Sequence, residues 1–166
     1  MNRFTAILLP ILLLAHPARA AGPDVGADAA ALKACVEGAG DDARSCIETV
    51  ATPCVDGLSS DTDTGVNGCY DREAEAWDRV LNDNYQAAMT DASSYDTGAR
   101  ENGGDPEAAA ALKKAQRAWI AFRDAECDRL YARNMDGTIR FTVYAACQNR
   151  LTAERAIELG LTDEPR

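Results

Sequence analysis

The sequence predicts an all-α fold. Three long helices, linked by disulfides, are expected to form a helical hairpin or three-helix bundle, and a small helical extension is expected at the N-terminus. In three long stretches the apolar residues recur at spacings of three, four and seven, the period of one helix face. The chain lacks runs of alternating β-branched residues of the kind that form half-buried strands. Six cysteines, an even number, lie near the predicted turns.

Residues 1–20 have the layout of a secretory signal peptide. Arg3 precedes an apolar stretch from Phe4 to Ala15, and the small-x-small sequence Ala18-Arg19-Ala20 is typical of a cleavage site. The apolar stretch is too short and too interrupted by proline to span a bilayer. We therefore expect cleavage near Ala20 and a periplasmic or secreted product, with no membrane anchor in the mature chain.

Removal of this leader changes the charge of the chain and the kinds of catalytic site that it can form. The 166 residues carry a formal net charge of −10, and the mature chain carries −12, because the leader holds Arg3 and Arg19 and no acidic residue. The single histidine, His16, also lies in the leader, so the mature chain can form no histidine-based triad or histidine-containing zinc site. The acidity argues against nucleic acid and anionic membranes as partners and favours a basic protein.

The N-terminal part of the mature chain is predicted to hold short helices and a loop. Residues 27–51 read as two short helices on either side of the turn Gly38–Asp42. Residues 53–64 combine Asp, Ser and Gly and read as a loop.

The first long helix is expected over residues 67–90, with Thr64 or Asn67 as its N-cap. The following segment, residues 91–105, contains Ser-Ser, Thr-Gly and Asn-Gly-Gly sequences, which predict a long mobile loop. The inward face of the helix is predicted to hold Tyr70, Ala74, Trp77, Leu81 and Ala88.

Two further long helices are expected. The second opens at Asp105-Pro106, with the aspartate as cap and the proline in the first turn, and ends near Arg133. After the breaker Asn134–Gly137, the third spans residues 138–159 and stops at Gly160. The predicted inward residues are Leu112, Ala115, Trp119, Phe122 and Leu130 on the second helix, and Ile139, Val143, Ala146, Ala153 and Ile157 on the third.

This organisation divides the chain into four parts. They are a signal peptide (1–20), an N-terminal helical extension (21–53), a helical domain (54–160) and a C-terminal tail (161–166). The chain contains no internal repeat that would point to a second domain.

The cysteines are expected to form three disulfides in an oxidising compartment. Two antiparallel helices place residues equidistant from their turn at the same level, and each neighbouring pair of cysteines is centred on a predicted turn. The spacing therefore predicts Cys35–Cys46, Cys54–Cys69 and Cys127–Cys147, and the alternative crosses the pairs of the first four cysteines. In the chain-entropy model each loop of this size stabilises the fold by about 3 kcal/mol.

Polar residues also fall on the apolar faces of the predicted helices. Arg123 and Gln116 lie within the stripe of the second helix, and Glu73 flanks Trp77 on the first. If the hairpin turns near Gly98, Glu73 and Arg123 are level. This arrangement predicts either a polar binding site between helices or, as we favour, a buried ion pair that fixes which faces meet. Both tryptophans are expected in the core.

Calcium, glycosidase and thiol chemistry are each poorly supported. The stretch Asp61–Gly68 is similar to a calcium loop, but Val66 stands where the loop needs glycine and Arg72 where it needs glutamate. Nothing places two carboxylates around a cleft for glycoside hydrolysis, and no Cys-x-x-Cys pair occurs. We therefore expect no catalytic residue, metal or cofactor. The carboxylates weighed for hydrolysis are Glu73, Asp124 and Glu126.

Four ordered blocks carry a family resemblance over about residues 54–159. The blocks are Cys69 with Glu73, Trp77-Asp78, Leu81-Asn82 and Tyr85; the run AQRAWIAFRDAEC, which includes Gln116, Trp119, Arg123, Asp124 and Cys127; Gly137; and Cys147 with Leu151-Thr152, Arg155 and Leu159. Together they resemble the LprI-like lysozyme-inhibitor family. The resemblance implies an exported, mostly helical, disulfide-bonded domain that inhibits cell-wall lysozyme by direct binding. The extension with Cys35 and Cys46 is additional to that core, and the shared motif residues are expected to serve folding.

The sequence and the resemblance together predict an exported, non-enzymatic binding protein. Its expected partner is a C-type lysozyme or another basic envelope protein, which an acidic protein would attract electrostatically. The alternative is an envelope protein of the same fold that binds another partner or a cell-wall fragment. The contact residues are expected in the loops Asp56–Gly65 and Asp91–Gly104, at Asp56, Asp61, Asp63 and Arg100.

Overall fold

The computed structural model describes residues 24–60 and 62–161, and this part of the chain is helical without any strand, as predicted. The predicted signal peptide, Asp61 and most of the predicted tail lie outside the described residues. The elements are α1 (Val25–Ala39), the 3-10 helix η1 (Gly40–Cys46), α2 (Ala51–Asp56), α3 (Asp63–Glu101), α4 (Ala108–Arg133) and α5 (Ile139–Gly160).

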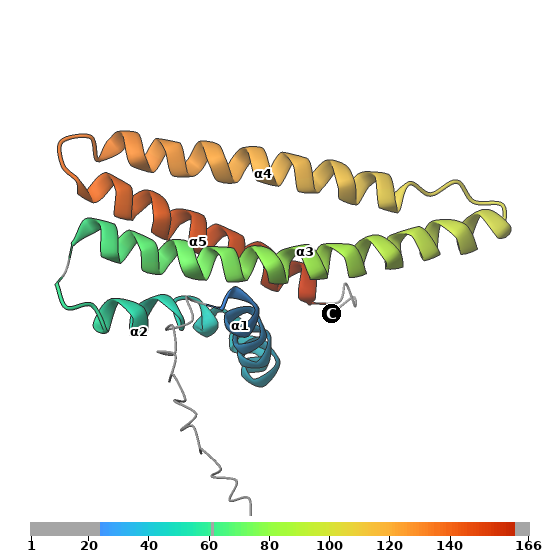
Figure 1. The fold of residues 1–166 in the computed structure, drawn as a ribbon. Helices are drawn as coiled ribbons and strands as arrows, with labels where there is room; N and C mark the ends of the chain where they lie inside the picture. The colour runs from blue at the N-terminus through green and yellow to red at the C-terminus, as the bar shows by residue number, and fades with distance from the viewer. Residues whose placement is uncertain (1–23, 61, 162–166) are drawn as a thin grey trace, which may run out of the picture.

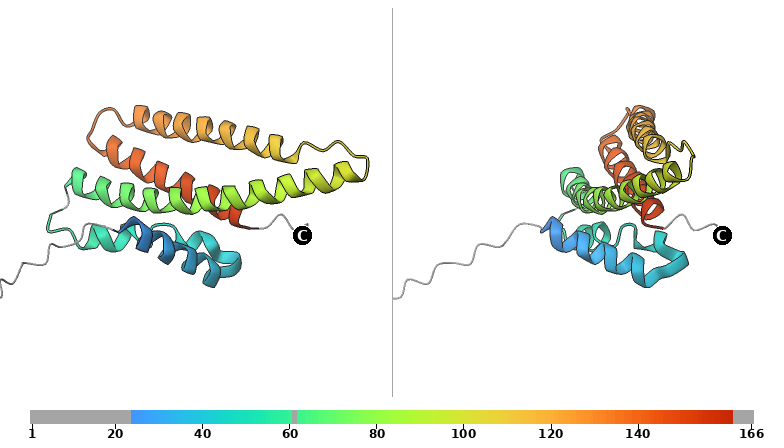
Figure 2. Two further views of the ribbon diagram at one scale, coloured as in Figure 1. Left: turned by 45° about the vertical axis from the view of Figure 1, so that its right-hand side comes forward. Right: turned by 90° about the vertical axis from the view of Figure 1, so that its right-hand side faces the viewer.

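The three long helices lie side by side, with α3 as the longest (Figure 1). α5 runs parallel to the first half of α3, and side-chain hydrogen bonds link Asn67 to Thr142 and Asn84 to the Ala156 carbonyl. α4 runs antiparallel to both (Figure 1). α1, η1 and α2 form a second layer on the other side of α3 (Figure 2). Because α5 ends beside the middle of α3, the far ends of α3 and α4 project as a two-helix arm.

The main core lies where α1 and η1 meet α3 and α5. Trp77 of α3 and Leu32 of α1 are completely buried there, and Trp119 of α4 packs against the cluster while only partly buried. The prediction of two core tryptophans therefore holds for Trp77 and only in part for Trp119. The other buried members are Ala29, Ala43, Cys46, Ala76, Val80, Leu81, Ala153, Ala156 and Ile157.

The structure forms the three predicted disulfides. Cys35–Cys46 joins α1 to η1, Cys54–Cys69 joins α2 to α3, and Cys127–Cys147 joins α4 to α5. Each bond therefore connects two consecutive elements across one turn, which is the property on which the prediction rested. The last bond, with Leu151, Leu130 and Tyr144, forms a second small core.

The predicted mobile loop over residues 91–105 is wrong for most of its length, because α3 continues to Glu101. The hydroxyl groups that suggested turns donate instead to the carbonyl four residues back in the same helix, as Ser93 does to Met89 and Thr97 to Ser93. The helix ends only at Asn102, and Gly103 adopts a φ of +82° that favours glycine. The actual turn is therefore short and lies later than predicted.

Two boundaries at the start of the domain also differ from the prediction. The expected loop over residues 53–64 is partly helical, because α2 extends to Asp56 and tolerates Pro53 in its first turn, where no intrahelical N–H bond is lost. α3 begins at Asp63, and its cap is Thr62, whose hydroxyl accepts the Gly65 N–H at 3.2 Å. Neither Thr64 nor Asn67 is the cap.

The inward stripe predicted for α4 is correct in part, because Trp119 and Leu130 pack against the two cores and Leu112 is half-buried. Only Cys127 of this helix is buried, Ala115 is exposed, and Phe122 is 56 % exposed. α4 lies on the outside of the bundle, so only one narrow side of it meets α5 and α3 (Figure 2). The predicted inward position of Ile139 on α5 is also wrong, since 53 % of this residue is exposed at the turn.

The N-terminus of α4 is capped by the neighbouring helix rather than by Asp105. The buried carboxylate of Asp96 on α3 accepts the backbone N–H groups of Ala108 at 2.9 Å and Ala109 at 3.1 Å. An acceptor at this position satisfies donors that a helix start leaves open. Asp96 thereby ties the two helices of the arm together near its tip.

Candidate functional site

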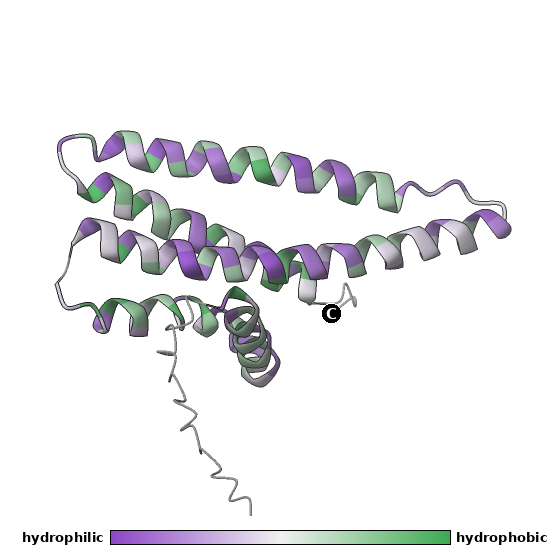
Figure 3. Cartoon of the chain, viewed as in Figure 1, coloured by the Kyte–Doolittle hydropathy of each residue, from purple (hydrophilic) through white to green (hydrophobic). Residues whose placement is uncertain are grey.

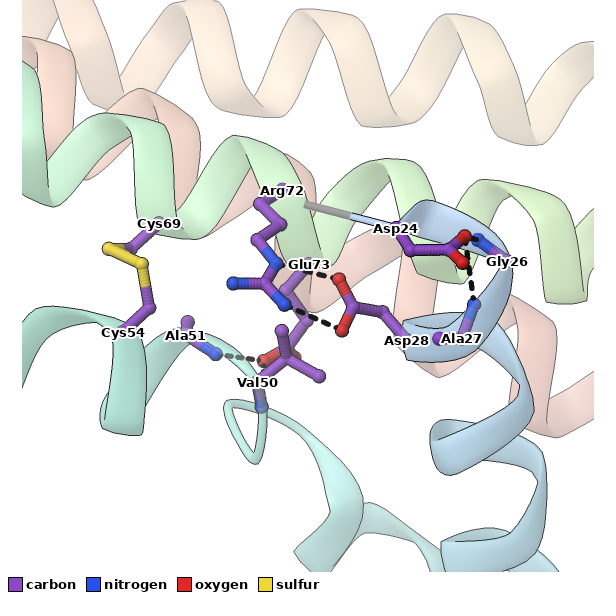
Figure 4. A network of polar contacts seen from close by, with 10 residues as sticks. All are labelled: Asp24, Gly26, Ala27, Asp28, Val50, Ala51, Cys54, Cys69, Arg72 and Glu73. Carbon is purple, nitrogen blue, oxygen red and sulfur yellow. Dashed lines mark hydrogen bonds and ion pairs between the residues drawn. A yellow bond between two sulfur atoms is a disulfide. The ribbon is translucent and has the colours of Figure 1, made fainter. Parts of the chain in front are cut away.

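Glu73 stands at the centre of a buried polar network beside the core. The side chain is completely buried, and its carboxylate accepts the backbone N–H groups of Val50 (2.8 Å) and Ala51 (2.7 Å) (Figure 4) and that of Glu48 (2.6 Å). It also accepts the Trp77 indole N–H at 2.9 Å and the amide of the α5 residue Asn149 at 3.1 Å. These five bonds connect the η1–α2 segment to α3 and α5, so the role of Glu73 is to hold the fold together.

The predicted Glu73–Arg123 ion pair is wrong. Arg123 instead binds its neighbour Asp124, with Nη2 at 2.9 Å from the carboxylate, and its guanidinium lies 5.3 Å from the centre of the Trp119 ring. The prediction placed the hairpin turn near Gly98. Because the turn comes after Glu101, α4 is shifted along α3, and the neighbour that meets Glu73 is Asn149 of α5.

A second contact ties α1 to α3 beside this network (Figure 4). The Arg72 guanidinium donates two bonds to the Asp28 carboxylate, at 2.6 and 2.8 Å, and these bonds raise the pKa of Arg72. Asp24 caps α1 by accepting the N–H groups of Gly26 and Ala27. The N-terminal extension is therefore fixed against α3.

An open groove with a volume of about 720 Å³ runs along the exposed side of α3. Its floor carries the carboxylates of Asp71, Glu75 and Asp78, which the spacing of four and three residues aligns on one helix face. Within the described part of the chain these three carboxylates form no ion pair, and Asp78 accepts one bond from Asn82 at 2.9 Å. The other lining residues are Val25, Ala74, Arg79, Asn82, Asp83, Arg123, Gln148 and Thr152.

The pKa of the Asp71 carboxyl group is raised in this groove. Partial burial raises the pKa of its carboxyl group, and the neighbouring charge of Glu75 raises it further. Both effects disfavour the ionised form, so a cationic group placed near Asp71 and Glu75 would relieve an unfavourable interaction. The lining holds four acidic residues and two arginines, so the groove carries a net negative charge.

Acidity is concentrated in one part of the protein. Residues 24–88 contain fourteen acidic and four basic side chains, a net charge of −10, whereas residues 119–161 contain six of each. The first set forms α1, η1, α2 and the first half of α3, and the second set forms most of α4 and α5. The acidic groove thus belongs to a strongly acidic half, and the opposite half is neutral.

The motif residues divide between this groove and the contacts between helices. Asp78, Asn82 and Arg123 line the groove. Gln116 of α4 accepts a bond from Arg155 of α5 at 3.0 Å, and Asp124 holds Arg123. Tyr85 is half-buried on α3.

The predicted contact residues do not form one site. Asp56 is exposed at the end of α2 and Asp63 in the first turn of α3, whereas Arg100 lies in the last turn of α3, at the opposite end of the longest helix. Asp61 lies outside the described residues.

The carboxylates of Asp71 and Glu75 were missed. The predicted residues of this helix lie on its apolar face, whereas the spacing of Asp71, Glu75 and Asp78 on the polar face is the sequence signal for these carboxylates.

Two classes of site have no support among the described residues. No group of three or more His, Cys, Asp or Glu side chains there is arranged to hold a metal ion. No helix within residues 24–60 and 62–161 is both long and apolar enough to cross a membrane.

Comparison with known proteins identifies the family. The sequence model described as lysozyme inhibitor LprI matches residues 54–159, the segment that contains α3, α4, Cys54 and nearly all of α5. An uncharacterised protein of Rhizobium meliloti (strain 1021) is 37% identical over 99 residues, which cover 57% of this chain and 68% of that relative. No solved structure gives a significant match. The family resemblance predicted from the sequence is confirmed, and the chain belongs to the lysozyme inhibitor LprI family.

Proposed function

We propose that this protein is an exported, non-enzymatic inhibitor that binds directly to a basic cell-wall hydrolase of the lysozyme type. Family membership supports the activity, and the three disulfides fit an oxidising compartment outside the cytoplasm. The observation that carries the proposal is the groove on α3, where three carboxylates that have no ion-pair partner among the described residues lie within the acidic half of the protein. C-type lysozymes are basic, so opposite fields would speed and orient their encounter with this surface.

The surroundings of the three carboxylates weighed for hydrolysis favour binding over catalysis. Glu73 is buried and accepts five hydrogen bonds, so it has no access to a substrate. The pKa of Glu126 is lowered by its hydrogen bonds from Arg129, which is the wrong direction for a general acid. Asp124 is bound to Arg123. A glycosidase needs one carboxyl group of raised pKa facing a second across a cleft, and these three residues supply no such pair.

Lysis of a peptidoglycan suspension by C-type lysozyme tests the proposal. We expect the purified mature protein to slow the loss of turbidity in proportion to its concentration, and added salt to weaken the inhibition because it screens the attraction. Lysis by this protein alone would show that it is a hydrolase. Unchanged lysis would contradict the proposal and leave the alternative, an envelope protein of the same fold that binds another partner or a cell-wall fragment.

A further inference from the structure

The turn between α4 and α5 exposes three large apolar side chains, which we call the turn patch: Met135, Ile139 and Phe141. Phe141 is 43 % exposed, and the other two are exposed to more than half. Three large apolar groups within seven residues of one turn differ from the single apolar residues scattered over most protein surfaces. They are the kind of group that becomes buried at the centre of a protein interface. Ile139 and Phe141 are two residues apart on α5 and point to different sides of the helix, and Phe141 is the one that lines a groove with α3.

The ring of Phe141 is held in place from two sides. The edge of Tyr131 meets it with ring centres 5.6 Å apart, and the Arg140 guanidinium lies 4.5 Å from its centre. Arg140 is itself fixed by donating to the Tyr131 hydroxyl at 3.0 Å and to the Gly137 carbonyl at 2.8 Å. A partner that packs on Phe141 would therefore meet a ring that is already ordered, which lowers the entropic cost of binding.

Phe141 shares a groove with two carboxylates of α3. Phe141 and Thr138 line a second open groove of about 550 Å³ together with Asp63 and Asp71 of α3. Asp71 also lines the larger acidic groove, so the two grooves are neighbours on α3. The Arg140 guanidinium beside the ring donates hydrogen bonds to Tyr131 and Gly137.

We infer that Phe141 in the turn patch is the apolar anchor of the surface that binds the basic hydrolase, with the carboxylates of Asp63, Asp71, Glu75 and Asp78 as its charged rim. This inference rests on the proposed function and names the surface that carries it out. An apolar centre with a charged rim is the usual anatomy of a specific interface, in which the aromatic residue sets the dissociation rate and the charges set the association rate. The acidic rim disfavours an anionic membrane or a second acidic copy of this chain as the occupant.

Binding kinetics with immobilised C-type lysozyme separate the two contributions. We expect Phe141→Ala to raise the dissociation rate about tenfold or more, as expected for an interface hot spot, and to leave the salt dependence of association unchanged. Asp71→Asn should instead lower the association rate and flatten its dependence on salt. Phe122→Ala is the matched control, because Phe122 is 56 % exposed on the outer helix α4 and belongs to neither groove.

Hydrogen exchange of the wild-type complex gives a readout that needs no variant. We expect lysozyme to slow amide exchange around the α4–α5 turn and the start of α3, and to leave the tip of the arm unchanged. If the wild-type protein binds but Phe141→Ala behaves like Phe122→Ala, or if protection falls on the arm, Phe141 is not the anchor while the proposed function stands. If the wild-type protein binds no lysozyme, both proposals are wrong. Binding of wild-type protein, but not of Phe141→Ala, to anionic lipid vesicles would overturn the choice of partner.

Discussion

The two halves of α3 are stabilised in different ways although they form one continuous helix. The first half packs between α1 and α5 and buries six side chains, among them Trp77 and Glu73. The second half projects with the start of α4 as the arm and buries only Asp96. Figure 3 shows the second half mostly in pale colours, because it is built of small and weakly polar residues. Tertiary contacts therefore hold the first half, whereas local hydrogen bonds and one interhelical cap hold the arm.

Removal of Glu73 should have the largest effect on stability. Glu73→Ala would leave three backbone N–H groups, an indole N–H and an amide without their acceptor in a buried site, so we expect a loss of about 3–5 kcal/mol in the free energy of unfolding. Urea unfolding followed by circular dichroism measures this loss. The matched control is Glu75→Ala, an exposed glutamate on the same helix. Equal losses in the two variants would contradict the role of the buried network.

Removal of the disulfide between α4 and α5 should have the second-largest effect on stability. Replacing Cys127 and Cys147 together by alanine removes a link that closes a loop of 20 residues, and we expect a loss of about 3 kcal/mol. The same unfolding measurement under non-reducing conditions checks the value. A loss near zero would contradict the expected value, and a loss above that of Glu73→Ala would show that the disulfide, rather than the buried network, dominates stability.

A substitution in the arm should destabilise the arm alone and leave the core unchanged. Asp96→Ala removes the acceptor for two backbone donors at the start of α4, and we expect a cost of about 1 kcal/mol, as for other helix caps. Hydrogen exchange at the start of α4 should become faster, while exchange around Trp77 stays the same. Asp91→Ala, an exposed aspartate of the same arm, is the control. Faster exchange throughout the core would show that the two halves of α3 unfold together.

The smallest effect is expected at Asp71 and should depend on pH. Because folding raises the pKa of this carboxyl group above 3.8, its ionisation opposes folding, and this cost appears as the pH rises through the folded-state pKa. Asp71→Asn should therefore be slightly more stable than the wild type at neutral pH, and the difference should shrink as the pH falls through the folded-state pKa and disappear below 3.8. Urea unfolding at several pH values measures this difference. An Asp71→Asn variant that is less stable than the wild type at neutral pH would contradict this prediction.

Local signals predicted the all-α class and the disulfides, because both depend on patterns within one or two neighbouring elements. Helical spacing revealed the long helices, and cysteines centred on turns revealed their partners. The arm was missed because Ser93 and Thr97 usually favour turns, and their bonds to carbonyls within the helix depend on the helix already being formed.

Pairing between distant helices could not be predicted in the same way. Glu73 meets Asn149, 76 residues away, and that contact depends on where the hairpin turns and on which helix lies beside α3. The groove was missed for a related reason. Asp71 and Glu75 look like ordinary surface charges in the sequence, and only the packing of α1, α4 and α5 around α3 turns their face into the floor of a groove.

Calorimetric titration of C-type lysozyme with two variants of equal charge tests most directly whether the acidic groove is the binding surface. One variant neutralises the groove (Asp71→Asn, Glu75→Gln, Asp78→Asn), and the other neutralises three exposed acids of α1 and η1 (Glu37→Gln, Asp41→Asn, Asp42→Asn). We predict that at low salt the groove variant loses most of the affinity while the second variant stays close to the wild type. Equal losses in both variants would show that net charge alone attracts lysozyme, and would contradict a binding surface on α3.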